Sequence, residues 1–293
     1  MALTFARVGF AVSRSWRAIT SLGLLISVIA AITSNAHATG PRLAQSAATL
    51  PSHCVALVDY DRRPPVRYAA TGTKLDIGEV RIRYVGHSSF RIETPGGITI
   101  ITDYAGYAGE GPTPHIATMN QAHSSHFTTT PDPEIKHVLP GWNPAGGPAR
   151  HNITVGDVRV RNVPTDIRDY VGGRLKDGNS IFVFEAAGLC IGHLGHLHHK
   201  LSPDDIAKIG RLDIVLVPVD GTFTMDQDSM REVAATLKSK IVIPMHWFTI
   251  NSLNEFLLGA AKDFTVETLN KREVVISLND LPSRPKVLVL SPF

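Results

Sequence analysis

Histidine is concentrated in one short stretch of the chain. Four histidines fall within seven residues: His193, His196, His198 and His199. The preceding residues Ile181–Glu185 have the apolar pattern of a strand. The following residues Ser202–Asp205 are typical of a helix start, with serine at the N-cap, proline at the first position and acids in the first turn. The histidines are therefore expected on a loop at a strand end, where α/β folds place their chemistry.

Two further histidine-bearing stretches, His123/His126 and His246, also follow predicted strands. Imidazole is available near neutral pH and binds zinc, iron or copper through one ring nitrogen. Three or four histidines and a water form a catalytic metal site with an open position. Any single one of these histidines is equally well explained as part of a solvated loop, but their grouping favours a metal site.

The rest of the pattern predicts two packed sheets covered by helices. From Lys74 onward the early strands form hairpins and the later strands alternate with helices, which fits two sheets better than one doubly wound sheet. The polar, glycine-containing stretch Asp166–Asp177 is expected to be an insertion. The main expected strands are Val80–Tyr84, Phe90–Glu93, Ile98–Thr102, Ile214–Pro218, Ile241–Pro244 and Lys286–Leu290, and the expected helices are Pro203–Ile209, Asp226–Leu237 and Leu253–Ala261.

Residues 1–38 have the pattern of a secretory signal peptide. A basic region with three arginines and no acid precedes the apolar run Ile19–Ile32, and Ala36–Ala38 is a small-x-small cleavage site. A retained membrane anchor is the alternative, but the apolar run is short for a spanning helix. The mature protein is therefore expected to be periplasmic or secreted, with no membrane partner after cleavage.

Length and composition limit the domain organisation and the partners expected of the mature chain. Residues 39–73 are expected to form an extended or partly disordered lead-in, which leaves residues 74–293 as one domain with a sizeable core. The whole chain has 29 Lys and Arg against 26 Asp and Glu, and the three leader arginines account for the excess. A mature chain without net charge points to no nucleic-acid partner, so a small molecule is the expected substrate.

The chain contains two cysteines, Cys54 and Cys190. Cys190 lies between apolar residues of a predicted strand and is expected to be buried and free. A bridge to Cys54 is the alternative, which an oxidising compartment would allow. Sequence spacing alone does not bring two Cα atoms within bonding reach.

Several short motifs accompany the histidines: Val85–Phe90, Thr102–Asp103, Gly178–Phe182, His193–Gly195, Leu216–Val219 and Ile243–His246. With the strand order above, this set resembles the metallo-β-lactamase superfamily, and more narrowly its branch of uncharacterised metal-dependent hydrolases near the ascorbate-phosphate lactonases. The resemblance covers Lys74 to about Pro292. It implies an α/β fold, the four-layer αβ/βα sandwich of the metallo-β-lactamase type, and a metal-dependent hydrolase of an ester, lactone, amide or phosphoester. The leader pattern adds the expectation that this hydrolase is exported.

The metal ligands depart from the family's pattern. The signature His-x-His-x-Asp-His falls on Gln121–His126, where glutamine and serine replace the first histidine and the aspartate. The family's next histidine falls at Arg168, and its bridging aspartate falls at His196. Two neighbouring cations need bridging anions and carboxylates, so the loss of carboxylates predicts one divalent metal, with zinc favoured over iron. The expected ligands are His126, His196 and His246, with His123 as an auxiliary fourth.

Other residues near these motifs receive supporting roles. Three are expected behind the ligands, where they orient an imidazole or support a loop: His87, Asp103 and His193. Arg168 cannot bind a cation, and it is expected either to hold an anionic substrate group or to pair with Asp169. His199 is a candidate substrate contact, and His198 is expected to face solvent.

Two functions stay open at this point. In the first, the metal lowers the pKa of a bound water toward about 7, and the resulting hydroxide attacks the substrate. In the second, the protein is a non-catalytic metal-binding protein or a pseudoenzyme on the same fold, because several ligand positions are altered and fold does not imply function. An aspartate replaced by another good ligand at His196 resembles a retuned site more than random loss, which favours the enzyme.

The mature protein should lack residues 1–38, because the basic region, the apolar run and the Ala-x-Ala site together direct cleavage after Ala38. The measurement is the intact mass of protein recovered from the exported fraction. A mass that still includes Met1 would refute the signal peptide and favour a retained anchor.

Overall fold

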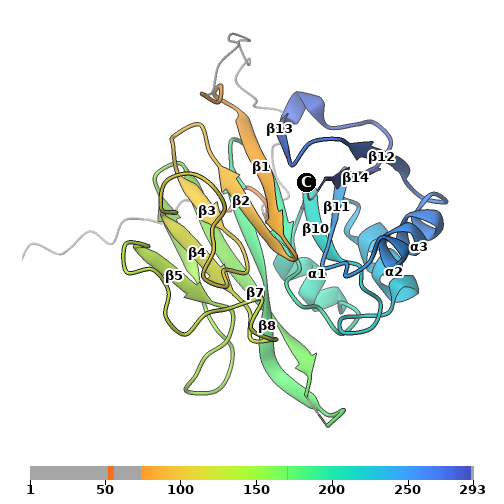
Figure 1. Ribbon diagram of the computed structural model, residues 1–293, viewed down its shortest axis with the longest axis horizontal. Coiled ribbons are helices and arrows are strands. Elements are labelled where there is room, and N and C mark those ends of the chain that lie inside the picture. The colour runs from red at the N-terminus through yellow and green to blue at the C-terminus, as the bar shows by residue number, and fades with distance from the viewer. Residues whose placement is uncertain (1–51, 56–73, 170, 292–293) are drawn as a thin grey trace, which may run out of the picture. The chain divides into compact units, whose positions relative to one another are not determined.

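The computed structural model describes residues 52–55, 74–169 and 171–291 (Figure 1). The predicted signal peptide, residues 1–38, and most of the predicted lead-in lie outside these ranges. Within the described ranges, every helix is too short or too polar to cross a membrane.

Two mixed β-sheets form the domain. Sheet A has six strands in the order β13-β1-β2-β3-β4-β5, and sheet B has eight in the order β12-β14-β11-β10-β9-β8-β7-β6. Sheet A consists of β1 (Glu79–Gly86), β2 (Ser89–Glu93), β3 (Thr99–Ile101), β4 (Ile116–Met119), β5 (His137–Pro140) and β13 (Glu273–Ser277). Sheet B consists of β6 (Asn152–Val155), β7 (Val158–Arg168), β8 (Arg174–Ala186), β9 (Leu189–His193), β10 (Ile214–Pro218), β11 (Ile241–Met245), β12 (Thr265–Leu269) and β14 (Lys286–Leu290).

The main core lies between the two sheets. Ile82 and Phe90 of sheet A and Phe182 and Leu216 of sheet B are all fully buried there. Burial alternates along β1, as expected of a strand with one face on the core, whereas β10 and β11 are buried throughout. Parallel strands covered on both faces read as continuous apolar runs, which explains the sequence Ile214–Pro218.

Helices cover the other face of sheet B: α1 (Pro203–Ile209), α2 (Gln227–Leu237) and α3 (Ile250–Ala260) (Figure 1). Ser202 caps α1 by accepting a hydrogen bond from the Asp205 backbone N–H at 3.1 Å, which satisfies one of the unpaired donors of the first turn. In the described part of the chain, the outer face of sheet A is covered by loops that carry Tyr104, Phe127 and Trp142. The α/β sandwich of two packed sheets is therefore confirmed.

The stretch Asp166–Asp177 is wrong as an insertion. It extends β7 and β8 into a long hairpin in which Ile167 pairs with Leu175, and Asp166 accepts a hydrogen bond from the Asp177 backbone N–H at 2.9 Å. The stretch lacks the apolar alternation by which strands are predicted, because this tip of the hairpin buries little apolar surface. β12 and β13 escaped detection for a similar reason, since most residues of β12 are exposed.

The expectation of a free Cys190 is also wrong. Cys190 is bonded to Cys54 across 136 residues, with a Cα–Cα distance of 5.9 Å. The Cys54 carbonyl also accepts a hydrogen bond from the Arg211 backbone N–H at 2.8 Å. Tertiary contacts bring the two cysteines together, and spacing along the chain carries no sign of them. The described piece of the lead-in, residues 52–55, is thereby fixed to the domain.

Denatured, unreduced protein should show no reactive thiol, and two should appear after reduction. Replacing both cysteines, in Cys54→Ser/Cys190→Ala, should lower the free energy of unfolding by about 2–4 kcal/mol, because the bond restricts the unfolded chain. Thiol titration and denaturant unfolding measure the two effects. Two reactive thiols before reduction would contradict the bond.

Candidate metal centre

Six strands end at one edge of the sandwich, and the segment after each carries a site residue. In sheet A, β1, β3 and β4 run in the same direction. In sheet B, β9, β10 and β11 are parallel neighbours. Their carboxyl ends therefore gather the candidate residues in space, as open α/β sheets commonly do. The residues so placed are His87, Asp103, His123 and His126 from sheet A, and His196, Asp220 and His246 from sheet B.

His126 is fully buried, and a carboxylate fixes its orientation. Its Nδ1 lies 2.6 Å from Oδ2 of Asp103, and Asn120 donates to the other oxygen of Asp103 at 2.9 Å. A carboxylate only accepts hydrogen bonds, so Nδ1 of His126 carries the proton. Nε2 consequently presents a lone pair toward the centre of the site. Asp103 thus contacts a histidine of the site, and its orienting role stays a prediction.

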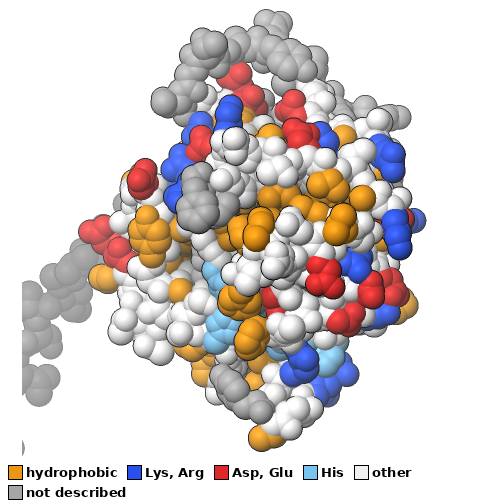
Figure 2. Space-filling view, turned by 45° about the vertical axis from the view of Figure 1, so that its right-hand side comes forward, with side chains coloured by type: hydrophobic (Ala, Val, Ile, Leu, Met, Phe, Trp, Pro, Cys, Tyr) orange, Lys and Arg blue, Asp and Glu red, His pale blue; other side chains and the backbone are white. Residues whose placement is uncertain are grey.

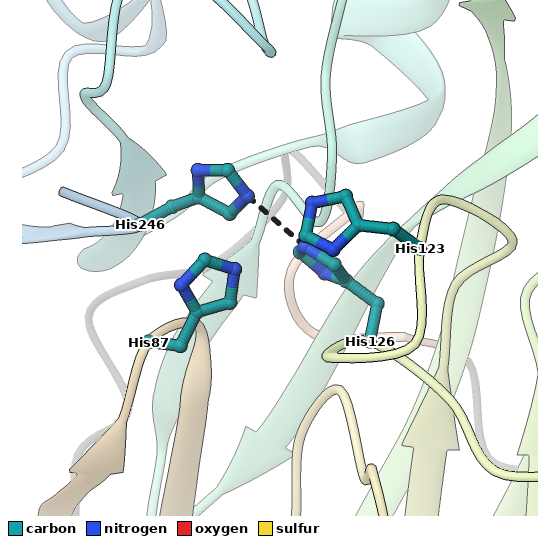
Figure 3. A group of neighbouring side chains, drawn as sticks. All are labelled: His87, His123, His126 and His246. Carbon is teal, nitrogen blue, oxygen red and sulfur yellow. Dashed lines mark hydrogen bonds between the residues drawn. The ribbon is translucent and has the colours of Figure 1, made fainter. Parts of the chain in front are cut away.

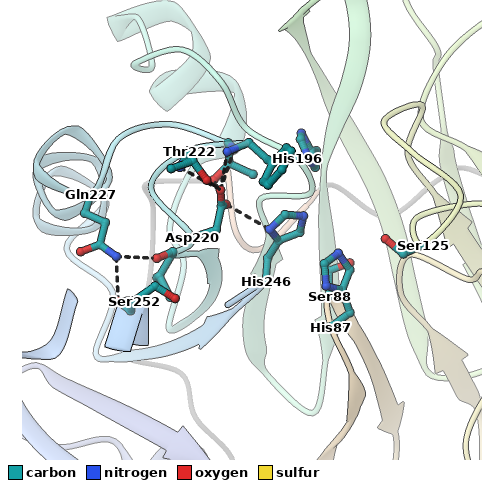
Figure 4. A network of polar contacts seen from close by, with 12 residues as sticks. His87, Ser88, Ser125, His196, Asp220, Thr222, Gln227, His246 and Ser252 are labelled. Atoms are coloured by element: carbon teal, nitrogen blue, oxygen red, sulfur yellow. Dashed lines mark hydrogen bonds and ion pairs between the residues drawn. The ribbon is translucent and has the colours of Figure 1, made fainter. Parts of the chain in front are cut away.

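His246 is held in the same way by a residue that the sequence analysis missed. Its Nδ1 lies 3.0 Å from Oδ1 of Asp220. The other Asp220 oxygen accepts from the backbone N–H groups of Thr222 at 2.9 Å and Phe223 at 2.5 Å (Figure 4). The sequence feature that could have identified Asp220 is its position, as an acidic residue two positions after the predicted strand Ile214–Pro218.

The two oriented imidazoles face each other. Nε2 of His126 and Nε2 of His246 are 3.0 Å apart (Figure 3). Both Nδ1 atoms donate to carboxylates, so in the neutral imidazoles both Nε2 atoms carry lone pairs, which repel unless a cation, a metal ion or a shared proton, lies between them. Two nitrogens on a tetrahedral zinc lie about 3.3 Å apart, given Zn–N bonds of about 2.0–2.1 Å. The observed pair therefore fits a shared metal.

Two more imidazoles complete this group. His87, His123, His126 and His246 each offer a nitrogen, and these atoms all lie within 4.8 Å of one another (Figure 3). The Nε2 atoms of His87 and His123 are buried and have no hydrogen-bond partner within the described ranges. Nδ1 of His123 lies 2.8 Å from Oγ of Ser125. His87, expected behind the ligands, lies within this group of four histidines, with its ring 4.1 Å from that of His246.

Three site residues have left-handed backbone conformations. The φ angles are 52° at His87, 42° at Asp103 and 55° at His246. Such a conformation costs a side-chain-bearing residue about 1–2 kcal/mol, so neighbouring contacts must stabilise it. One is a hydrogen bond from the His246 backbone N–H to the His87 carbonyl at 2.8 Å, which joins the two strand ends directly. Strain of this kind concentrates at functional sites.

His196 lies beside the group of four. Its ring centroid is 4.8 Å from those of His126 and His246, and its Nε2 is buried without a partner in the described structure. Its Nδ1 lies 3.0 Å from Nε2 of His198. His198 is half-buried and contacts His196, so the expectation that it faces solvent is wrong. The assignment of His196 as a ligand stays a prediction.

Arg168 fixes the neighbouring loop. Its guanidinium donates to the backbone carbonyls of Thr222, Phe223 and Thr224 at 2.6–2.9 Å. Its backbone N–H donates to Nδ1 of His198 at 2.6 Å. Among the described ion pairs none joins Arg168 to Asp169, the partner considered from sequence, and the guanidinium instead holds the loop that follows Asp220. A role in binding an anionic substrate group stays a prediction.

His193 and His199 lie outside the group of four. Nε2 of His193 donates to the Ser88 carbonyl at 2.8 Å, and its Nδ1 accepts from the Gly195 backbone N–H at 3.1 Å. Both nitrogens are thus engaged with backbone groups, and the supporting role expected of His193 stays a prediction. The ring of His199 contacts that of His198 at 6.3 Å. Among the described ring contacts, His199 has none with the group of four.

The electrostatics of the site favour a bound cation. Burial, followed by repulsion from neighbouring histidines, lowers the pKa of His87 to about 3 and that of His123 to about 4, so both are neutral ligands at pH 7. Burial alone would raise the pKa values of Asp103 and Asp220, but nearby histidines and hydrogen bonds outweigh it and hold both below their usual range. Two buried negative charges thus lie beside the imidazoles of His126 and His246, and no described lysine or arginine pairs with either.

Aromatic side chains border the site on the surface. Phe223 and Phe248 are 60% and 53% exposed, and their rings are 5.2 Å apart. Phe248 also contacts the rings of His87 and His246, at 5.3 and 5.1 Å. On the face drawn in Figure 2, histidine side chains reach the surface between apolar ones. The surface beside the histidines therefore offers apolar side chains to a ligand.

Comparisons with known proteins agree with this geometry. Residues 81–246 match the family described as the Beta-lactamase superfamily domain. The chain is 25% identical to a UPF0173 metal-dependent hydrolase of Methanocorpusculum labreanum, over 67% of this chain and 96% of that protein. It is 28% identical to another from Nanoarchaeum equitans, over 58% of this chain and 85% of that protein. A solved structure from Thermotoga maritima, provisionally named a Zn-dependent hydrolase of the metallo-beta-lactamase superfamily, superposes with a TM-score of 0.53 at 28% identity, covering 72% of this chain and 98% of that one.

Asp220→Asn should weaken zinc binding about 10–100-fold, the usual effect of losing a carboxylate behind a metal-bound histidine. The amide neither balances the metal's charge nor fixes the His246 tautomer. Chelator competition measures the affinity. Asp228→Asn, which changes an exposed carboxylate on α2, is the matched control and should bind zinc normally. Equal affinities in the two variants would refute the role of Asp220.

Proposed function

Since the chain belongs to the beta-lactamase superfamily, we propose that it is a metal-dependent hydrolase with one divalent metal at a histidine site. The ligands would be His126 and His246, with His123 and His87 beside them. Zinc is the favoured metal and iron the second choice, because imidazole ligands suit both. The substrate class is a small ester, lactone, amide or phosphoester.

One observation carries this proposal. The Nε2 atoms of His126 and His246 are 3.0 Å apart, and each imidazole donates a hydrogen bond from Nδ1–H to a buried carboxylate. Two lone pairs held this close need a cation between them. A purely structural pair of histidines would instead place an N–H of one against a lone pair of the other.

A single metal follows from the charge count. Asp103 and Asp220 contribute two negative charges, which balance one divalent cation. Both carboxylates are engaged with Nδ1 atoms and lie behind the imidazoles, so neither bridges two cations. A second metal close to the first would lack the bridging anion that offsets their repulsion.

When bound, a divalent metal supplies Lewis acidity, which lowers the pKa of water and polarises the scissile bond. The protein's own residues hold the histidines in place and orient their imidazole rings. Asp103 and Asp220 keep the Nε2 atoms directed inward, and Arg168 holds the loop that carries the donors to Asp220. Phe223 and Phe248 offer an apolar wall to the substrate. The leader pattern adds that this chemistry takes place in the periplasm or outside the cell.

The purified mature protein should carry close to one zinc or iron per chain, measured by elemental analysis. His126→Ala and His246→Ala should each abolish tight binding, because either leaves one lone pair of the facing pair. His137→Ala, on β5 in sheet A, is the matched control and should keep the metal. Two tightly bound ions per chain would contradict the charge argument.

Loaded protein should hydrolyse at least one member of a panel of esters, lactones, amides and phosphoesters, and His126→Ala should lose that activity. Phe223→Ala should raise KM for the substrate with the larger apolar group, because it removes half of the aromatic wall. A protein that binds one metal and hydrolyses none of the panel would favour the non-catalytic alternative.

A further inference from the structure

We propose that His196 is a hydrogen-bond donor to the reacting substrate and not a metal ligand. Its Nε2–H would point into the centre, and its proton is placed there by a chain of hydrogen bonds through His198. This inference rests on the proposed function for its chemistry, but the position of the proton is a property of the protein alone. The family's bridging aspartate falls at this position, so the residue changes from an acceptor to a donor.

The first step concerns the proton of His198. The Arg168 backbone N–H is 2.6 Å from Nδ1 of His198, and a backbone amide can only donate. Nδ1 is therefore the acceptor. Nε2 of His198 lies 2.6 Å from the carbonyl oxygen of Phe223, which can only accept. His198 is thus fixed from both ends with its proton on Nε2.

The second step passes this constraint to His196. Nδ1 of His196 lies 3.0 Å from Nε2 of His198, which carries a proton and has no lone pair to offer. Nδ1 of His196 must therefore accept, because two N–H groups at this distance would repel. A neutral imidazole has one ring proton, so the proton of His196 lies on Nε2. That nitrogen has no lone pair for a metal.

The third step concerns where Nε2–H of His196 points. The side chain is 96% buried, and Nε2 has no partner among the described residues. The ring lies 5.0 Å from that of His123 and 4.8 Å from those of His126 and His246. These ring contacts place His196 directly beside the group of four, and its donor is proposed to serve the same centre. A buried donor without an acceptor costs about 1–3 kcal/mol, which a bound substrate oxygen would recover.

Backbone contacts hold this arrangement in place. Asn179 accepts a hydrogen bond from the His196 backbone N–H at 2.8 Å. Gly195 has a φ of 60°, and a Cβ there would lie 2.4 Å from the side chains of Asn120 and Asn179. Arg168 donates to the Phe223 carbonyl that anchors His198. The donor is therefore preorganised, which is what makes such a group effective in catalysis.

The chemistry of this donor follows from its charge. When water adds to a carbonyl or phosphoryl group, negative charge develops on an oxygen of the substrate. An N–H directed at that oxygen stabilises the charge, and losing one such donor commonly costs about 10²–10³ in kcat. The aspartate that the family has at this position would repel the same oxygen. The proton stays on Nε2 throughout, so no bond to His196 is made or broken.

The direct test is ¹⁵N NMR of histidine-labelled full-length mature protein, without metal and with one equivalent of zinc. His196 should show a protonated Nε2 in both states, whereas Nε2 of His126 and of His246 should shift on zinc binding. Loss of the His196 Nε2 proton, with a zinc-induced shift at that nitrogen, would overturn the proposal. The state without metal tests the proton position even if the protein hydrolyses nothing.

Substitutions at His196 distinguish a hydrogen-bond donor from a metal ligand. His196→Gln and His196→Leu should both keep one zinc per chain with affinity changed less than about threefold, whereas His126→Ala loses it. In the active enzyme, His196→Leu should lower kcat about 10²–10³-fold, and His196→Gln, which keeps an N–H donor, should recover part of the loss. His198→Phe should let the His196 proton move to Nδ1 in the NMR spectrum. Loss of zinc in both His196 variants would show that His196 is a ligand.

Discussion

Two buried carboxylates determine how the site is built. Asp103 and Asp220 each accept a hydrogen bond from the Nδ1–H of one histidine, and so they turn the lone pairs of His126 and His246 toward each other. With these carboxylates, the site has a fixed negative charge and a fixed direction for its lone pairs. Its affinity for a cation is thus a property of the residues behind the ligands as much as of the ligands.

The fold matters because each carboxylate–imidazole pair comes from a different sheet. Asp103 and His126 follow strands of sheet A, and Asp220 and His246 follow strands of sheet B. The 3.0 Å contact between the two imidazoles therefore depends on how the sheets pack. The buried apolar layer between the sheets holds them at their separation. The hydrogen bond from the His246 backbone N–H to the His87 carbonyl joins the two sheets at the edge where the site lies. The geometry of the site accordingly depends on the packing of the core.

Sequence reasoning identified the two-sheet sandwich and most of the histidines, because apolar periodicity and strand ends are local signals. The role of His87 was not local, since its ring joins the group through a left-handed backbone conformation that no spacing rule reveals. Asp220 was missed because a single acid in a loop has no signature until its neighbours are known. His198 was expected to face solvent because its hydrogen-bond partners are distant in sequence. They come from β7 and from the loop after β10. The Cys54–Cys190 bond escaped for the same reason, because its ends are 136 residues apart.

The disulfide also bears on how long the protein lasts. Cys190 belongs to β9, and the loop that carries His196 begins where this strand ends. A chain that lacks the bond opens more often around β9, and proteases act on opened chains in proportion to how often they open. Surroundings that keep thiols reduced would shorten its half-life before they altered its chemistry. The redox state of the environment would then control the abundance of the active protein, and not its turnover.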